Sequence, residues 1–155
     1  MRELTLNPDY AEALRRVVNR CPYFTLLSME IQELQWGTSL VGLDLKEKHL
    51  QPFGRVHGGV IASVVDAAVF WAVFTEIEDG KGLTTAEVKL NYLAPVQSGR
   101  LLAQGRCIKI GRSLGLGDAQ VFDVNGNLVA HGTSTVMILP ELVLSGDPAL
   151  PPKFL

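Results

Sequence analysis

Cysteine is scarce in this sequence, and neither sign of charge is in large excess. The two cysteines among 155 residues provide neither a disulfide framework nor a zinc-ligand spacing. The 14 basic and 16 acidic residues leave a net charge of −2, so there is no global basic field to attract nucleic acid or anionic lipid. The three histidines have no ligand spacing and no acidic cluster beside them. We therefore expect no metal site and no nucleic-acid partner.

A membrane-spanning run and an export signal are also missing. The chain leads from Met1-Arg2-Glu3 directly into a polar segment, which is unlike a signal peptide. The longest apolar run, residues 60–74, covers about 15 residues, fewer than the roughly 20 needed to span a bilayer. An acid, Asp66, interrupts it near its centre. We expect a cytoplasmic protein without a membrane segment.

The composition is typical of one folded domain. Hydrophobic residues make up 47% of the chain and charged residues 19%, enough apolar surface for a sizeable core. We expect a single domain over residues 1–139. Residues 140–155 contain four prolines and little periodicity, which predicts an extended or disordered tail.

Hydrophobic periodicity predicts a short and a long helix. The first, residues 8–20, has Asn7 as a plausible N-cap and Pro8 at its first position, and it should pack as an accessory cover. The long helix should run from about residue 58 to 77. Strands are expected at residues 29–36, 39–45, 83–93, 101–110, 113–124 and 128–139.

The order of these elements predicts an α+β fold, with a long central helix wrapped by a curved antiparallel sheet of five to six strands. In residues 83–93 strict alternation places Thr84 and Val88 on one face and Thr85 and Glu87 on the other. The long helix is apolar on almost every side, so one sheet cannot cover it. We expect a second subunit to cover part of the remainder.

The start and the middle of the long helix carry the candidate chemistry. Gly58 and Gly59 can leave backbone N–H groups bare at the helix N-terminus, where negative charge is favoured. Asp66 is a carboxylate in an apolar run, which is costly unless something compensates it. At ~1.5 Å per residue it lies roughly 12 Å along the helix from Gly58, too far for both to act on one carbonyl. We therefore expect a second subunit to supply the group that complements each of them, so that Gly58 of one chain acts together with Asp66 of another.

These residues resemble the hotdog-fold acyl-CoA thioesterases, most closely the phenylacetate-pathway (PaaI-like) and 4-hydroxybenzoyl-CoA thioesterase group. The resemblance rests on His57-Gly58-Gly59, on an acid nine residues after His57, and on the strand end Asn91-Tyr92-Leu93-Ala94-Pro95. It covers roughly residues 28–139. It implies the hotdog fold and hydrolysis of an acyl-CoA, with an aryl or a medium- to long-chain acyl group, to free acid and CoA.

The resemblance also implies roles for individual residues. Asp66 matches the catalytic acid, which acts as base or nucleophile, and Gly58 matches the glycine whose N–H polarises the thioester carbonyl. His57 shapes the loop, Gln51 orients the carbonyl or water, and Thr85 positions water. Gln51 together with Asp66 mixes the patterns of the two branches, so the substrate class stays open. Asp66 as a structural buried acid is the alternative.

Further implications concern the ligand and the assembly. Four residues around a glycine turn are candidates for binding the CoA phosphates, with solvated surface charge as the alternative: Arg106, Lys109, Arg112 and Ser113. No cofactor is implied, since CoA is part of the substrate. The resemblance implies a homodimer with its active site at the interface, and dimers that pair into a homotetramer. A non-catalytic acyl-CoA binding or sensing protein is the rival hypothesis.

Overall fold

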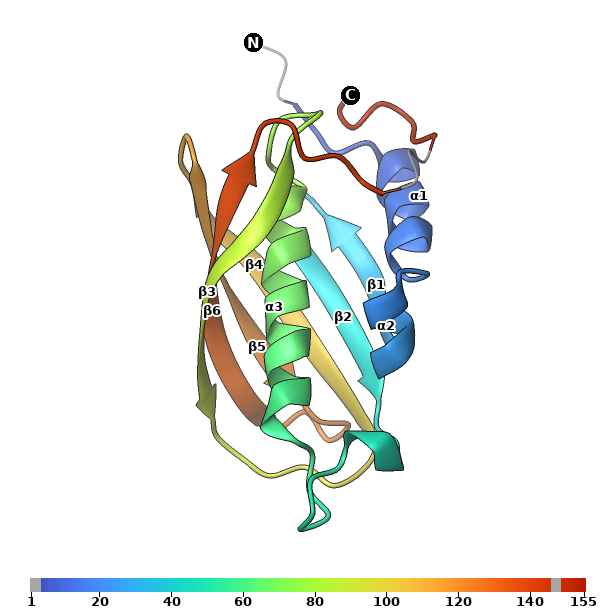
Figure 1. Cartoon of the computed structure of the whole chain (residues 1–155), viewed down its shortest axis with the longest axis vertical. Helices are drawn as coiled ribbons and strands as arrows, with labels where there is room; N and C mark the ends of the chain where they lie inside the picture. Colours follow the sequence, from blue (N-terminus) through green and yellow to red (C-terminus); the bar gives the residue numbers. More distant parts are fainter. Residues whose placement is uncertain (1–3, 146–148) are drawn as a thin grey trace.

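Six antiparallel strands form one curved sheet in the computed structural model, which describes residues 4–145 and 149–155 (Figure 1). The strands are β1 (Met29–Gln35), β2 (Thr38–Asp44), β3 (Gly82–Tyr92), β4 (Arg100–Ile110), β5 (Leu114–Phe122) and β6 (Leu128–Leu139). Their order across the sheet is β1-β2-β4-β5-β6-β3, so β1 and β3 are its edges. The predicted α+β architecture is confirmed.

The central helix α3 (Gly58–Phe74) packs along the concave face of the sheet (Figure 1). The helix lies close against β4, where a Cβ atom added to Gly105 would lie 2.2 Å from the carbonyl oxygen of Ala68. A side chain at Gly105 would therefore push helix and sheet apart. Ser39 on β2 donates a hydrogen bond to the same carbonyl at 2.6 Å, which holds the helix at this distance.

Both helices end earlier than periodicity predicts. α3 stops at Phe74 because Thr75 turns its hydroxyl to the Ala72 carbonyl at 2.7 Å and accepts the Gly37 N–H at 2.7 Å. The accessory helix α1 (Pro8–Val18) stops before Asn19, whose side chain instead pairs with the backbone of Ile31 on β1. In both cases a tertiary contact ends the helix.

A second short helix, α2 (Pro22–Leu27), was not expected from the sequence. It has six residues, too few for a helical repeat of apolar positions to be recognised. It begins at a proline in the first helical position and packs near β1.

Strict alternation along β3 is wrong. Thr85 pairs with Val136 of β6 and Glu87 pairs with Thr135, so Ala86 has no partner and forms a β-bulge. The extra residue changes the faces, so Thr85 lies on the helix side together with Val88 rather than opposite it. Thr84 is exposed.

Residues 149–155 of the expected tail are extended and pack onto the domain. Asn7 donates its backbone N–H to the Lys153 carbonyl at 2.9 Å. Lys153 is only 1% exposed, and its Nζ donates to the carbonyls of Phe74 and Ile77 at 2.7 Å each, just beyond the end of α3. Burial lowers the pKa of Lys153 to about 8. The predicted domain start at residues 1–3 and the tail residues 146–148 lie outside the described residues.

Within the part of the chain that the structure describes, no helix combines the length and the apolar character that crossing a bilayer requires.

Replacing Lys153 by Ala should detach residues 149–155 from the rest of the domain. The change removes the Nζ group that makes both hydrogen bonds beyond the end of α3, and it leaves two carbonyls that cost roughly 1–3 kcal/mol each when unsatisfied. We expect chymotrypsin to cleave the chain after residue 140 about tenfold faster or more, measured by mass spectrometry. Lys81→Ala is the control, because the ion pair that Lys81 makes within the described residues is with the exposed Glu78, at 2.8 Å. Equal cleavage rates for both variants would contradict this docking.

Candidate functional site

The N-terminus of α3 is shaped by His57. Its backbone takes the N-cap conformation, and its Nδ1 accepts the N–H of Gly59 at 2.8 Å. The next N–H along, that of Val60, bonds to the His57 carbonyl at 3.0 Å. The N–H of Gly58 has no acceptor among residues 4–145 and 149–155. It is therefore the donor that remains available to a ligand at this helix end.

Gly58 is also closely enclosed. Tyr92, at the end of β3, donates its hydroxyl hydrogen bond to the Gly58 carbonyl at 2.9 Å. A Cβ atom added to Gly58 would lie 3.1 Å from that hydroxyl oxygen. An open hollow of about 580 Å³ adjoins the helix end, lined by residues of the 56–61 and 92–96 segments. Glycine here keeps the N–H reachable from this hollow.

Asp66 lies at the middle of α3, where it is half-buried. Thr85 donates a hydrogen bond to its Oδ1 at 2.9 Å, and Ser134 on β6 donates to the same oxygen at 3.4 Å. Oδ2 accepts no hydrogen bond from the described residues. Burial raises the pKa of Asp66, and the two hydroxyl bonds oppose that shift. One carboxylate oxygen is thus held by the protein, and the other can act on a water or a carbonyl.

One stripe of α3 is not covered by the chain's own sheet. The residues of α3 that are partly or fully exposed, while the rest of the helix is buried, are Gly58, Gly59, Ala62, Ser63, Asp66, Phe70 and Trp71. Because Gly58 and Asp66 stand eight residues apart on a continuous helix, their separation is roughly 12 Å along its axis. Two groups this far apart cannot both contact one carbonyl group.

The other predicted loop residue, Gln51, lies before α3 and turns back into its own loop. Its side-chain Oε1 accepts the N–H of Phe53, and its backbone N–H donates to the Arg55 carbonyl at 2.7 Å. These contacts fix the 51–55 turn. The structure does not bring Gln51 to Asp66 of the same chain.

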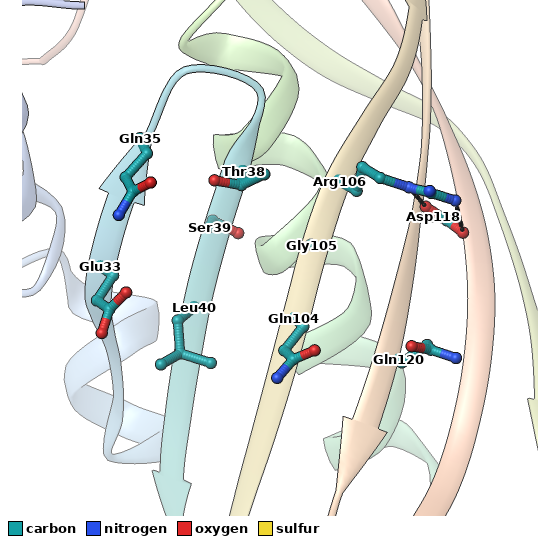
Figure 2. Close-up of a pocket in the computed structure, with 10 residues that line it drawn as sticks. All are labelled: Glu33, Gln35, Thr38, Ser39, Leu40, Gln104, Gly105, Arg106, Asp118 and Gln120. Carbon is teal, nitrogen blue, oxygen red and sulfur yellow. Dashed lines mark hydrogen bonds and ion pairs between the residues drawn. The ribbon is translucent and has the colours of Figure 1, made fainter.

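Arg106 lies on the outer face of the sheet, away from α3 (Figure 2). Its guanidinium makes two hydrogen bonds of 3.0 Å to the carboxylate of Asp118. Both residues line a polar hollow of about 590 Å³ that extends across β1, β2, β4 and β5. The charge of Arg106 is already matched by a carboxylate in this chain.

The remaining basic candidates lie at one end of the sheet. Lys109, Arg112 and Ser113 are exposed in and beside the β4–β5 turn. That turn is near the C-terminal half of α3, since the neighbouring Gly115 packs against Val73. Within one chain they are therefore at the opposite end of the helix from Gly58.

Two contacts of the site were not anticipated from the sequence, those of Ser134 and Tyr92. A signal for Ser134 exists, because it is the polar residue among the alternate positions of β6 that face the helix. Tyr92 stands in the strand end that carries the family resemblance, but its bond to Gly58 joins segments 34 residues apart.

The described part of the chain contains no cluster of three or more possible metal ligands. Burial and the nearby Glu76 raise the pKa of Cys107 to about 12, so its thiolate is disfavoured. The Nε2 atom of His131 lies 3.7 Å from the Oδ2 atom of Asp118, and not beside the thiol of Cys107.

Comparisons with known proteins agree on one family. The family described as "Thioesterase superfamily" matches residues 53–130. A protein of Saccharolobus solfataricus that carries a provisional esterase name is 34% identical, over 76% of this chain and 78% of its own. A 1,4-dihydroxy-2-naphthoyl-CoA hydrolase of Listeria monocytogenes is 29% identical, over 72% of this chain and 91% of its own.

Solved structures show the same fold. A thioesterase family protein from Silicibacter pomeroyi superposes with a TM-score of 0.77 at 28% identity, covering 84% of this chain and 98% of its own. A thioesterase from Haemophilus influenzae superposes with a TM-score of 0.81 at 22% identity, covering 92% and 99%.

Replacing Asp66 by Asn should stabilise the fold near neutral pH. The folded state raises the pKa of Asp66, so the ionised group favours the unfolded chain once pH exceeds the ordinary aspartate range. We expect Asp66→Asn to melt above the wild type at pH 7, and the difference to shrink as pH falls toward the ordinary aspartate pKa of about 3.9 and to be absent below it. Asp118→Asn, which loses a guanidinium partner, should not raise the Tm. A pH-independent decrease in Tm for Asp66→Asn would contradict this reading.

Proposed function

The chain belongs to the thioesterase superfamily and is a thioester hydrolase, and we propose that it hydrolyses an acyl-CoA to the free acid and CoA. The proposed acyl group is an aryl or a medium- to long-chain one. The observation that carries this proposal is the arrangement along α3. Asp66 has one carboxylate oxygen held by Thr85 and Ser134, and among the described residues neither its other oxygen nor the N–H of Gly58 at the helix start has a partner. The relative named as a naphthoyl-CoA hydrolase supports CoA as the leaving group.

In the proposed reaction, the thioester carbonyl oxygen lies at the Gly58 N–H. As the carbonyl carbon becomes tetrahedral, this donor stabilises the negative charge that develops on oxygen. Asp66 either takes a proton from the attacking water through Oδ2 or attacks the carbon itself to form an anhydride that water then hydrolyses. The carbon–sulfur bond breaks, and the CoA sulfur leaves as a thiolate that is protonated to the thiol. Thr85 holds the carboxylate and positions the water.

The proposed active site combines Gly58 of one chain with Asp66 of another. Two features of the single chain support a homodimer. The uncovered stripe of α3 adjoins β3, and β3 is a sheet edge of 11 residues with one side unpaired in the chain. An edge of that length readily pairs with a second strand. Pairing of β3 with its copy would bring two α3 helices to the same interface.

Supporting roles follow for the remaining candidates. His57 fixes the helix start through its bond to the Gly59 N–H, so it positions the Gly58 donor. Gln51, in the loop before α3, would orient the carbonyl or the water. To do so, its side chain would have to break its hydrogen bond to the Phe53 N–H and bind the substrate or water instead. Lys109, Arg112 and Ser113 would bind CoA phosphates across the assembly, with Arg106 less available because Asp118 holds it. Pairing of dimers into tetramers and a cytoplasmic location stay predictions.

The direct test is a thiol-release assay over a panel of acyl-CoAs that varies chain length and includes aryl groups. We expect the wild type to release CoA and Asp66→Asn to lower kcat by roughly 10²–10⁴-fold, the usual contribution of a positioned general base. CoA binding, measured by calorimetry, should be unchanged in the variant. Full turnover by Asp66→Asn on every substrate would contradict the role of Asp66, and tight binding without wild-type turnover would contradict hydrolysis of acyl-CoA.

The oxyanion donor can be removed without removing the helix. Proline fits the first position of a helix and lacks an N–H, and His57 already has the extended backbone (ψ 135°) that a residue before proline prefers. Gly58→Pro should therefore lower kcat by about 10²–10³-fold. Gly58→Ala is the matched control, since its Cβ crowds Tyr92 similarly but the N–H remains.

Mixing the two inactive variants tests whether each site is shared. In a heterodimer of Asp66→Asn with Gly58→Pro, one site keeps both intact groups and the other loses both. Random pairing makes about half of the dimers mixed, so activity should return to about a quarter of the wild-type value. If both groups act within one chain, mixing restores nothing.

A further inference from the structure

A second cavity, of about 690 Å³, lies beside the C-terminal half of α3. We name it the C-terminal cavity. It is lined by α1, α3, the start of β3 and the chain after β6, with Tyr10, Phe70, Trp71, Phe74 and Leu83 among its apolar walls. Its volume falls in the range of about 300–1,000 Å³ that is usual for small-molecule sites. Its lining is mainly apolar and aromatic, which suits an apolar ligand.

The C-terminal cavity adjoins the acid of the proposed active site along two elements. On α3, Phe70 follows Asp66 by four residues, which puts the two side chains one above the other on the same helix face. On β3, Leu83 precedes Thr85 by two residues and shares its face, and Thr85 is bonded to Asp66. The cavity therefore begins roughly 6 Å from the carboxylate along either element, which is four residues along α3 or two residues along β3.

Two aromatic side chains on this part of α3 are not fully buried in the hydrophobic core. Phe70 and Trp71 remain partly exposed, although Ala72, Val73 and Phe74 are buried. Trp71 has its ring centroid 5.1 Å from that of Phe70 in an edge-to-face arrangement. Partly exposed aromatic surface at a cavity is available to an apolar group of a ligand.

The chain after β6 supplies about half of the cavity wall. Figure 1 shows residues 140–145 leaving the sheet and crossing the end of α3 toward α1. The lining residues after β6 are Leu142, Val143, Leu144, Ser145, Leu150, Pro151, Pro152 and Lys153. Lys153 fixes the far part of the wall, because its buried Nζ binds the Phe74 and Ile77 carbonyls and lies 4.4 Å from the centroid of the Phe74 ring.

We propose that the C-terminal cavity receives the acyl or aryl group of the thioester. The wall residues after β6, at 142–145 and 150–153, set the size of the group that fits. This inference rests on the proposed function and extends it. The carbonyl end of the substrate lies at Asp66, and the apolar group runs past Phe70 toward the end of α3. Leu144 and Leu150, which are partly buried in the wall, limit its length.

A larger side chain in the wall of the C-terminal cavity should change which acyl-chain lengths the enzyme prefers. For Leu150→Trp we expect the ratio of kcat/KM for decanoyl-CoA to that for acetyl-CoA to fall by roughly tenfold or more, since excluding about two methylene groups has that effect. Leu150→Ala, which widens the cavity, should shift the preference toward longer chains. Val124→Trp is the matched control, because Val124 is 61% exposed after β5 and outside the cavity, and it should leave the ratio unchanged.

The outcomes separate this inference from the proposed function. A folded Leu150→Trp with the wild-type ratio would overturn the cavity assignment while leaving acyl-CoA hydrolysis intact. If Leu150→Trp does not fold, Leu150→Ala and Leu144→Trp carry the same test. If the wild type hydrolyses no acyl-CoA, calorimetry with decanoate still tests the cavity. Decanoate binding that Leu150→Trp abolishes would support it, and absent binding to the wild type would overturn it.

Discussion

A carboxylate held inside an apolar helix is the constraint on which the rest of this structure depends. Ionised Asp66 would be costly in α3 without partners, and Thr85 and Ser134 compensate it from two different strands. Both bonds require β3 and β6 to lie beside the helix in one register. Both hydroxyls bind Oδ1, so Oδ2 accepts no hydrogen bond from the described residues. The contacts that compensate the acid therefore leave one of its oxygens available for the proposed chemistry.

Incomplete coverage of α3 is the second constraint, and it connects stability with function. The chain's own sheet buries most of the helix but leaves the stripe that contains Gly59, Asp66 and Phe70. An apolar helix exposed in this way favours association with another apolar surface. The same stripe carries the acid, so whatever covers it also determines what reaches the carboxylate. In the proposed dimer, assembly and substrate access would therefore depend on the same helix face.

Local sequence patterns predicted the elements well where a single residue type decides the outcome. His57-Gly58-Gly59 marked the start of α3, and Asn7-Pro8 marked the start of α1. Patterns failed where a distant contact decides: Thr75 ends α3 through the β1–β2 turn, and the bulge at Ala86 appears only when β3 is paired with β6. Strict alternation could not reveal that bulge, because an unpaired residue is defined by the partner strand.

The architecture, the candidate acid and the glycine helix start could be predicted from the sequence, because they depend on residue type and on spacing along one chain. Which groups meet could not be predicted in this way, because it depends on how the chain packs. The tertiary structure placed Thr85 and Ser134 on one oxygen of Asp66, paired Arg106 with Asp118, and folded Lys153 under the end of α3. These contacts join segments between 12 and 79 residues apart, and no local pattern encodes them. Their energies depend on burial and distance, which exist only once the chain is packed.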